Sequence, residues 1–425
     1  MNSVKFPYGK DFLEYDFSNE NFLGTLTSSL HAYTPKAGAD ALVAEAMANP
    51  TGSKTLKELA RGKKNVVIIA SDHTRPVPSK VIIPPMLKEI REGNPDAQIT
   101  ILIATGCHRY TTHDELVAKF GEKTVNEEKI VVHVSTEDEN MVRIGTLPSG
   151  GALLINRIAA EADLLVAEGF IEPHFFAGFS GGRKSVLPGV SAKETVLANH
   201  CAEFIAHPKA RTGVIDGNPI HEDMLFAAKC AKLAYVVNVV INEKKEAIFA
   251  VAGDVEAAHR AGCDFLSKLC RTEPKWADVV ISTNGGYPLD QNVYQSVKGM
   301  TAAEASVKEG GVIIMISSCS DGHGGEEFFR QMSLDTADTE KEILSRGRGE
   351  TLPDQWMTQI LIRILNRASV ILISDAPDEM IEKMHMIPSH SLEDAMKKAK
   401  AVLKNENPTV TAIPDGVAVM VVENK

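Results

Sequence analysis

Short apolar runs alternate with polar loops and longer amphipathic stretches along most of the chain. The runs NVVIIA at Asn65–Ala70 and ITILIA at Ile99–Ala104 are continuous and rich in β-branched residues. Such runs are typical of strands in a parallel sheet that is covered on both faces. The same pattern predicts further strands at Ile130–Val134, Asp163–Ala167, Ala234–Ile241 and Ala247–Val251, and helices near Val81–Glu92 and Val255–Leu269.

A break at Thr272-Glu273-Pro274 separates this region from a second region with the same alternation. There the pattern predicts strands at Asp278–Ser282, Gly311–Ile316, Val370–Ser374, Val410–Ile413 and Val417–Val422, and helices at Trp356–Ala368 and Ser391–Leu403. We therefore expect two α/β domains with mainly parallel sheets, residues 1–271 and 272–425. The last strand is a candidate to pack back on the N-terminal domain.

Polar clusters follow several of these predicted strands directly. The clusters are Asp72–Arg75, His108-Arg109 and His174–Lys184. Ligands of open α/β sheets bind beyond the carboxyl ends of the strands, so the clusters are expected at one edge of the sheet. We expect the active site at this edge, in the cleft between the two domains.

The net charge of −11 over 425 residues argues against nucleic acid or an anionic membrane as the main partner. An anionic ligand would need a local basic pocket, for which the candidates are Arg75, Arg183, Lys184 and Lys298. The six cysteines are scattered without a C-x-x-C pair, which predicts neither a disulfide framework nor a zinc finger and suits a reducing cytoplasm. No signal peptide and no long apolar run is evident, so we expect a cytoplasmic protein without a membrane span.

The stretch Glu172–His200 combines histidines, glycines and an Arg-Lys pair, and three general motifs compete for it. Gly178–Gly182 fits the G-x-S-x-G elbow of hydrolases, but that elbow needs a strand ending at its first glycine, and the predicted strand ends near Ala167. Gly178–Ser185 nearly matches a P-loop, except that Arg183 replaces the glycine before the lysine. A glycine-rich anion-binding loop leading into a helix stays open as the third interpretation.

Three histidines stand out by position. His108 and His174 each follow a predicted strand within a polar loop, where functional residues concentrate. His200 lies close to Lys184, in a helix that Ser191-x-x-Glu194 predicts to begin with a capping box. A lone helical histidine is more often structural than a ligand. The remaining candidates are interpreted as surface or satisfied core residues: His133, His207, His221, His259, His385 and His390.

Six separate motifs, in order, resemble the nickel-pincer lactate racemase family. They are Ser71–Ser79, Ala104–Arg109, Glu168–Gly189, Ala198–His200, Ser282–Met300 and Asp321–Glu326. The resemblance covers nearly the whole chain and implies an isomerase that acts on lactate or a similar short-chain 2-hydroxy acid. It also implies a cofactor, the nickel pyridinium-3,5-bisthiocarboxylic acid mononucleotide (the nickel-pincer nucleotide), which maturation enzymes supply.

The resemblance assigns a role to each matching residue. Lys184 would hold the cofactor covalently, His200 would bind the nickel, and His108 and His174 would be the paired acid and base. Cofactor contacts would come from Asp72, His73, Thr74, Arg75, Gln295 and Lys298. Substrate contacts would come from Arg75, Lys298 and Tyr294, and Trp356 would belong to a lactate-type pocket.

The chemistry explains these residue types. The α-carbon of a 2-hydroxy acid is very weakly acidic, because the neighbouring carboxylate is already negative. Removal of hydride avoids that barrier and needs an electron sink, while an imidazole takes the hydroxyl proton. Two enantiomers need two bases, which accounts for two histidines. The alternatives are a hydrolase or phosphate-binding protein using Gly178–Ser185, a racemase or epimerase of another 2-hydroxy acid, and a cofactor carrier without turnover.

Overall fold

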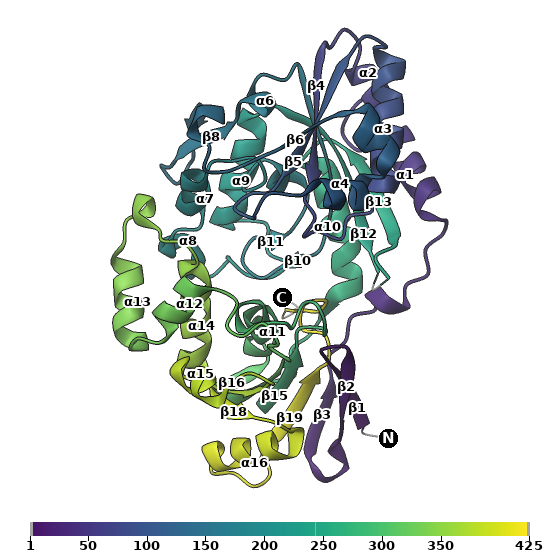
Figure 1. The fold of residues 1–425 in the computed structure, drawn as a ribbon. Coiled ribbons are helices and arrows are strands. Elements are labelled where there is room, and N and C mark those ends of the chain that lie inside the picture. Colours follow the sequence, from purple (N-terminus) through teal and green to yellow (C-terminus); the bar gives the residue numbers. More distant parts are fainter. Residues whose placement is uncertain (1–2, 243, 423–425) are drawn as a thin grey trace. The chain divides into compact units, whose positions relative to one another are not determined.

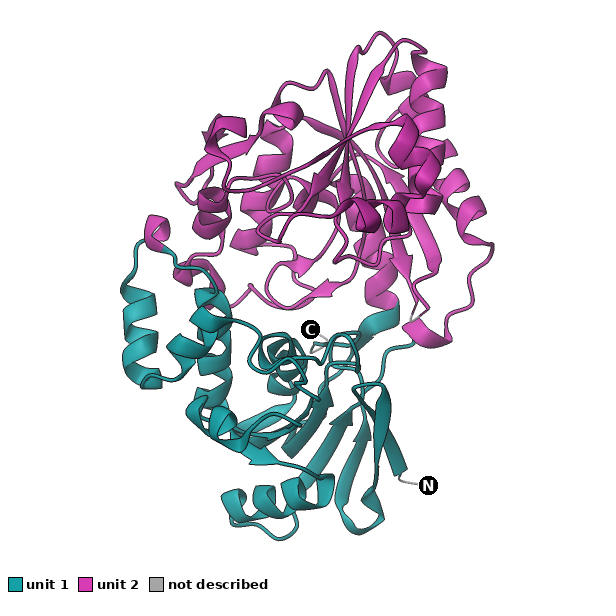
Figure 2. Cartoon of the chain, viewed as in Figure 1, with its two compact units in different colours: residues 1–29, 269–347, 351–425 teal, residues 30–268, 348–350 magenta. Residues whose placement is uncertain are grey.

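The computed structural model describes residues 3–242 and 244–422, and the chain divides into two compact units (Figure 2). Unit 1 contains residues 1–29, 269–347 and 351–425, and unit 2 contains residues 30–268 and 348–350. The predicted division at residue 272 is therefore wrong for the first 29 residues. They belong to unit 1 because β3 (Asn21–Thr25) pairs in parallel with β19 (Thr409–Ile413), a partner far away in the sequence.

The end of the chain pairs within unit 1. Strand β20 (Met420–Val421) pairs in parallel with β14 (Arg271–Thr272), and both strands belong to unit 1. That the last strand also packs back on the N-terminal domain stays a prediction.

Unit 2 is built on a six-stranded sheet in the order β13-β12-β9-β4-β5-β6 (Figure 1). These strands are β4 (Asn65–Ser71), β5 (Gln98–Ala104), β6 (Lys129–Val132), β9 (Leu164–Phe170), β12 (Leu233–Ile241) and β13 (Ala247–Gly253). All neighbours are parallel except β12 and β13. Two small hairpins accompany the sheet: β7 (Met141–Thr146) with β8 (Ala152–Asn156), and β10 (Pro173–His174) with β11 (Gly178–Phe179). The mainly parallel sheet predicted from the sequence is confirmed.

Helices connect these strands. They are α1 (Ala39–Ala48), α2 (Leu56–Leu59), α3 (Ser79–Gly93), α4 (His113–Phe120), α5 (Glu122–Glu127), α6 (Arg157–Ala160), α7 (Lys193–Asn199), α8 (Ala202–Ala206), α9 (Pro219–Cys230) and α10 (Ala257–Cys270). In Figure 1, α1 and α3 lie on one side of the sheet and α6 and α9 on the other.

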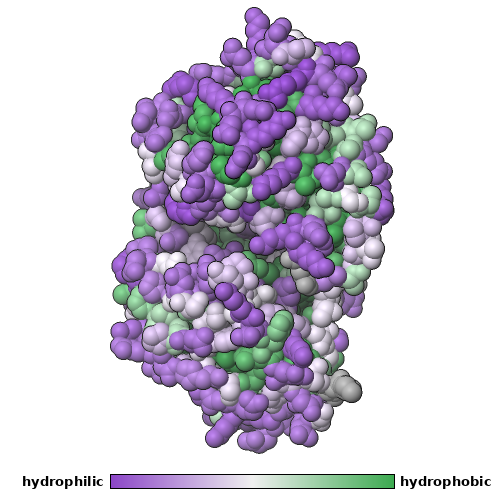
Figure 3. Space-filling view, turned by 45° about the vertical axis from the view of Figure 1, so that its right-hand side comes forward, coloured by the Kyte–Doolittle hydropathy of each residue, from purple (hydrophilic) through white to green (hydrophobic). Residues whose placement is uncertain are grey.

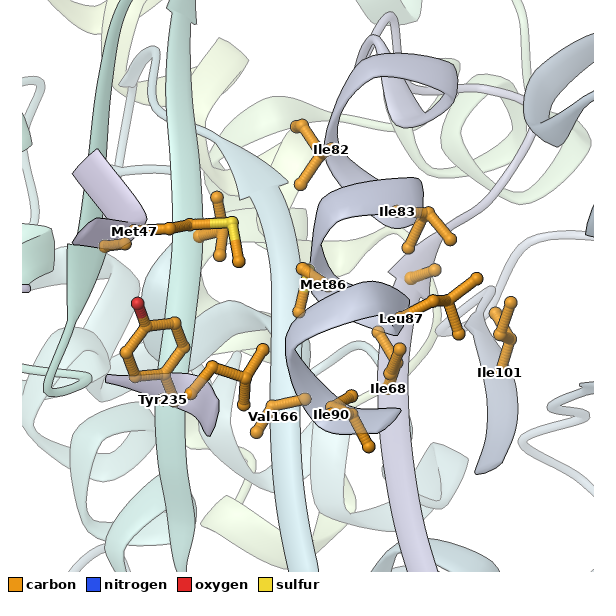
Figure 4. Packing of buried hydrophobic residues seen from close by; sticks show 14 of the residues in the cluster. Met47, Ile68, Ile82, Ile83, Met86, Leu87, Ile90, Ile101, Val166 and Tyr235 are labelled. Carbon is orange, nitrogen blue, oxygen red and sulfur yellow. The ribbon is translucent and has the colours of Figure 1, made fainter. Parts of the chain in front are cut away.

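Apolar side chains of α3 pack against the central strands (Figure 4). Ile82, Met86 and Ile90 recur every fourth residue, so they share one face of the helix. That face meets Ile68 of β4 and Val166 of β9, and all five side chains are fully buried. Burying each of them stabilises the fold by about 1.5–3 kcal/mol. This packing fixes the position of the sheet edge that carries the site.

The strand order places a crevice beside β4. From β4 the chain adds β5 and β6 on one side, and it then returns to add β9 and β12 on the other side. Neighbouring connections therefore leave β4 and β9 in opposite directions, and ligands bind at such a switch point. The loop Asp72–Arg75 follows β4, and the segment that leads to His174 follows β9.

Unit 1 has a fully parallel six-stranded sheet in the order β18-β17-β16-β15-β19-β3. Its other strands are β15 (Ala277–Thr283), β16 (Val307–Ile316), β17 (Ser369–Ile373) and β18 (Ile387–Ser389), and a hairpin joins β1 (Ser3–Tyr8) to β2 (Asp11–Asp16). Its helices are α11 (Val293–Glu304), α12 (Glu326–Met332), α13 (Thr336–Ser345), α14 (Gln355–Arg367), α15 (Asp378–Lys383) and α16 (Leu392–Leu403). Phe6 and Phe17 of the first residues are fully buried in the core beneath α16.

The spacing Thr112-x-x-Glu115 in the sequence predicts a capping box, which the structure confirms and which gives a test of local stability. The Thr112 hydroxyl accepts from the Glu115 amide, and the Glu115 carboxylate accepts from the Thr112 amide at 2.9 Å. Replacing Thr112 by Ala should lower the free energy of unfolding by about 1 kcal/mol, because an N-terminal amide of α4 loses its acceptor. Denaturant unfolding measures this loss, and Thr112→Ser, which keeps the hydroxyl, should be neutral. Equal losses in both variants would contradict the capping role.

The face shown in Figure 3 is covered mainly by hydrophilic residues, with smaller apolar areas between them. Among the described helices, none is both long enough and apolar enough to cross a lipid bilayer.

Candidate functional site

Asp72 and His108 form an acid–histidine pair at the ends of two adjacent strands. Asp72 follows β4, His108 follows β5, and the Asp72 Oδ2 lies 2.8 Å from the His108 Nδ1. A carboxylate only accepts, so the His108 Nδ1 carries the proton and Nε2 keeps its lone pair. The His108 side chain is 41% exposed, whereas that of Asp72 is 1% exposed. The pair therefore presents a basic nitrogen on an exposed ring.

The environment keeps Asp72 ionised. Burial acts to raise the pKa of this carboxyl, but the hydrogen bond and charge of His108 outweigh it, so the pKa lies below its ordinary value. Thr74 adds to this effect because its amide and hydroxyl both donate to Oδ1, at 3.2 and 2.7 Å. Asp72, predicted as a cofactor contact, thus lies where it orients His108.

His174 is held in the opposite tautomer. It lies in the β10–β11 hairpin, opposite Gly178, and its Nδ1 accepts a hydrogen bond from the Ala177 amide at 3.3 Å. In the neutral ring the proton is then on Nε2. Phe175 stacks on the imidazole and Phe176 meets it edge-on, with ring centroids 5.1 and 4.6 Å away. His174 therefore presents a donor nitrogen, whereas His108 presents an acceptor.

Lys184 belongs to a tight glycine loop. Gly181 and Gly182 have φ of 76° and 54°, which a side chain rarely tolerates. A Cβ on Gly182 would lie 2.8 Å from the His259 ring. The Gly182 amide donates to Asn238 Oδ1 at 2.8 Å, and the Lys184 amide donates to the Gly181 carbonyl at 3.1 Å. These two amides are therefore committed within the protein, which disfavours the anion-binding interpretation of the loop.

Arg183 and Ser180 have structural roles in this loop. Arg183 is fully buried, and its guanidinium donates to the Ala177 carbonyl at 2.7 Å and to the Gly181 carbonyl at 3.2 Å. It does not line a basic pocket, so that expectation is wrong. The Ser180 hydroxyl donates to the Phe170 carbonyl and accepts from the Glu172 amide. A hydroxyl held by backbone groups is a poor nucleophile, which disfavours a hydrolase.

A cavity of about 140 Å³ opens beside these groups. Its lining includes Asp72, Arg75, His108 and Lys184, together with the buried Glu168 of β9. Four glycines, which place no side chain in the wall, also line it: Gly106, Gly169, Gly181 and Gly189. Walls without side chains allow a flat ring to approach the backbone closely. The cavity thus brings together the predicted base and the predicted tether.

His200 is the C-terminal cap residue of α7 rather than an internal helix residue. The predicted capping box at Ser191 is wrong: the N-cap is Ala192, and the Ser191 hydroxyl donates to the Val186 carbonyl at 2.8 Å. Burial, and secondly the charge of Lys184, lower the pKa of His200 to about 3. The imidazole is therefore neutral at pH 7, the form that binds a metal.

Neighbouring elements hold the short helix α7. Thr195 donates to the Ala152 carbonyl at 2.8 Å, and Asn199 donates to the Ile220 carbonyl at 3.2 Å. The segment Arg348–Glu350, which belongs to unit 2, also packs against α7. Arg348 binds both carboxylate oxygens of Glu203 at 2.8 Å. A helix this short is unstable alone, so these contacts determine where His200 lies.

The remaining predicted residues divide between the two units. His73, at 3.0 Å from the Thr111 hydroxyl, and the exposed Thr74 and Arg75 belong to the loop after β4. Three others share the first turns of α11 in unit 1: Tyr294, Gln295 and Lys298. There the Lys298 Nζ donates to the Gln295 Oε1 at 2.6 Å, and the Tyr294 hydroxyl donates to Asp354 at 3.1 Å. Trp356 lies in α14 of unit 1.

Sequence reasoning missed several residues that support the site. The sequence predicts His259 to be an ordinary surface or core residue, yet its Nε2 lies 2.9 Å from the Arg183 Nη1 and 2.8 Å from the Ser180 carbonyl. Asn238 of β12 anchors the glycine loop. Glu168 was noticed only as part of a motif. A polar residue inside an otherwise apolar strand run was the available signal for Glu168 and Asn238.

The site in unit 2 thus combines an acid–histidine pair, a cavity lined by His108 and Lys184, and a second histidine of opposite tautomer on an α/β scaffold, which suits acid–base chemistry. Residues 8–213 match the family model for the lactate racemase N-terminal domain, and residues 272–421 match that for the C-terminal domain. The chain belongs to the lactate racemase family, whose members are isomerases.

Individual relatives agree with this assignment. The chain is 54% identical to a lactate racemase of Thermoanaerobacterium thermosaccharolyticum, with 100% of each chain covered. It is 53% identical to a lactate racemase of Lactiplantibacillus plantarum, covering 99% of this chain and 100% of the relative. The structure of the Thermoanaerobacterium apoprotein matches with a TM-score of 0.95, over 99% of this chain and 100% of that chain, at 54% identity.

A more distant structure, a Thermotoga maritima protein, matches with a TM-score of 0.63 at 19% identity and shares the fold alone. It covers 85% of this chain and 96% of that chain.

Proposed function

We propose that this chain interconverts D- and L-lactate, with His108 and His174 as the acid and base. The observation that carries the proposal is the complementary state of the two rings, one with a free basic nitrogen and one with a donor nitrogen. A racemase needs one group on each side of the reacting carbon, and two unlike histidines can serve both directions by exchanging roles. Another short-chain 2-hydroxy acid, chemically similar to lactate, is the second candidate substrate.

The residues present fit the implied nickel-pincer nucleotide. Lys184 lines a cavity with backbone walls, which suits a planar ring attached at the lysine. His200 is a buried neutral imidazole close enough to Lys184 for that charge to act on it, which suits a nickel ligand. When bound, this group supplies an electron-accepting ring that takes up and returns hydride.

The residues of the chain itself would transfer the substrate proton and orient the substrate. His108 Nε2 takes the hydroxyl proton, and Asp72 stabilises the imidazolium that forms, because it is an ionised partner at Nδ1. His174 Nε2 donates a hydrogen bond toward the 2-oxo oxygen from the other side. For the opposite enantiomer His174 Nε2 would take the hydroxyl proton, which requires the other neutral tautomer, with the proton on Nδ1 and the 3.3 Å hydrogen bond from the Ala177 amide given up. Proton uptake by an oriented imidazole typically contributes roughly 10²–10⁴-fold to the rate.

Binding of the substrate carboxylate is assigned to Arg75, Lys298 and Tyr294. An arginine offers a planar pair of donors that matches a carboxylate, and a lysine offers a point charge. Contacts of Asp72, His73, Thr74, Arg75, Gln295 and Lys298 with the cofactor remain predictions. We also propose that maturation enzymes supply the cofactor, and that the protein acts in the cytoplasm, where its six cysteines, none of them in a disulfide, would stay reduced.

The covalent tether provides the direct test of the cofactor. After co-expression with cofactor-making enzymes, intact-protein mass spectrometry should show an adduct on the wild-type chain that disappears in Lys184→Ala. Lys193→Ala, which removes a lysine from the start of α7, should keep the adduct. Loss of the adduct is expected to abolish interconversion of the lactate enantiomers. An adduct of unchanged mass in Lys184→Ala would refute the tether.

A substrate panel tests the activity itself. Loaded enzyme should convert either lactate enantiomer to a racemic mixture, and longer 2-hydroxy acids should react more slowly. Loaded protein that binds the cofactor but leaves both enantiomers unchanged would support a carrier instead.

A further inference from the structure

Glu168 is a buried carboxylate with one satisfied oxygen and one unsatisfied oxygen. The Oε1 atom accepts from the Ser71 amide at 2.8 Å, the Ser71 hydroxyl at 2.8 Å and the Ser79 hydroxyl at 3.2 Å. These bonds join the end of β4 to the start of α3. In the described part of the chain, Oε2 has no hydrogen-bond partner although the residue is 2% exposed.

A buried carboxylate oxygen without a hydrogen-bond donor lowers the stability of the fold, so such an atom calls for a structural or functional explanation. The scaffold function of Glu168 uses only Oε1, and a glutamine would serve it equally well. Glu168 lines the same cavity as Lys184. Lys119 interacts electrostatically with this carboxylate, but its ammonium donates a hydrogen bond to the Arg75 carbonyl at 2.9 Å. The spare oxygen therefore suits a donor that comes from a ligand in the cavity.

We propose that Glu168 is a ligand-binding residue whose Oε2 accepts a hydrogen bond from a ribose hydroxyl of the mononucleotide. This inference rests on the proposed nickel-pincer nucleotide. Glu168 lies on β9 beside β4, at the switch point of the sheet, where an acidic side chain of an α/β fold can hold ribose hydroxyls. A ribose hydroxyl is a neutral donor, and a carboxylate acceptor gives it a charge-assisted bond.

The substitution Glu168→Gln distinguishes the role of Oε2 from that of Oε1. Gln can keep its carbonyl oxygen toward Ser71 and Ser79, while its amide places a donor where the ligand needs an acceptor. Ser79→Ala is the matched control, because it removes a bond to Oε1 and leaves Oε2 untouched. Glu168→Gln should keep the wild-type unfolding temperature, whereas Ser79→Ala should lower it slightly because it loses one buried hydrogen bond.

The probe is nicotinic acid mononucleotide, added to the unloaded full-length chain and followed by calorimetry. Glu168→Gln should weaken binding roughly 10- to 100-fold, the loss expected for a hydrogen bond to a charged group, while Ser79→Ala should bind within about twofold of wild type. A probe that lacks the ribose hydroxyls should bind the wild-type chain as weakly as the mononucleotide binds Glu168→Gln.

Three outcomes would count against the inference. Unchanged affinity in Glu168→Gln overturns it while leaving the proposed function intact. Equal affinity of the wild type for both probes overturns it, because the carboxylate would then meet the ring charge instead of a hydroxyl. If the wild-type chain does not bind the mononucleotide, both the proposed cofactor site and this inference are overturned. If Glu168→Gln does not fold, Glu168→Asp, which withdraws the carboxylate by one methylene, takes its place.

Discussion

Replacing His108 by Ala is expected to slow racemisation roughly 10²–10⁴-fold, the usual contribution of a general base. The reason is geometric: Asp72 fixes the proton on Nδ1, so His108 presents the basic nitrogen in the resting protein. The adduct on Lys184 should survive, since the ring does not hold the tether. Polarimetry with loaded enzyme measures the rate, and mass spectrometry measures the loading.

Asp72→Asn sharpens this prediction. An amide nitrogen beside His108 Nδ1 would donate instead of accept, which reverses the tautomer while the shape stays the same. We expect Asp72→Asn to lose a large part of the racemisation rate that His108→Ala loses, while the amount of cofactor adduct on Lys184 stays unchanged. Full activity in either variant would exclude His108 as the base. His174→Ala should also lose activity, because each enantiomer needs both groups.

The second large effect is loss of stability in acid. Burial lowers the pKa of His133 from its ordinary value near 6.5 to about 4. Below pH 6.5 the unfolded chain takes up a proton there, whereas the folded chain does so only near pH 4. The unfolded state thus binds more protons in this window, and stability falls as the pH falls from 6.5 toward 4. His133 alone accounts for about 3 kcal/mol of unfolding free energy.

Other buried histidines in unit 2 act in the same direction. Burial lowers the pKa of His221 to about 3, and it lowers that of His259 well below the ordinary value. Denaturant unfolding at pH 7 and pH 5 should therefore show a steep loss of stability. His133→Asn should flatten that slope, whereas a change at the exposed His113 should not. A pH slope that is equal in wild type and His133→Asn would contradict the assignment.

Local signals succeeded where the partner lies within a few residues. Thr112 and Glu115 lie three positions apart, and their capping box forms as predicted. The same signature at Ser191 failed, because the Ser191 hydroxyl has a competing acceptor, the Val186 carbonyl. A capping motif shows which hydrogen bond a hydroxyl is able to form, but the tertiary contacts around it determine which partner it bonds to.

Charge patterns were less informative than apolar ones. Arg183 was grouped with the basic candidates for a ligand pocket, yet it donates to loop carbonyls from a fully buried position. Nothing in the sequence distinguishes a guanidinium that faces a ligand from one that satisfies backbone oxygens, because both occur beside glycines.

The sequence by itself determined the apolar strands, the α/β class with mainly parallel sheets, and the family, because these depend on patterns read along the chain. Only the tertiary structure decided that the first 29 residues belong to unit 1, that Asp72 orients His108, and that Glu168 keeps one oxygen spare. The physical reason is strand order. Side chains that follow different strands meet only when those strands pair, and pairing depends on contacts across the whole sheet rather than on neighbouring residues.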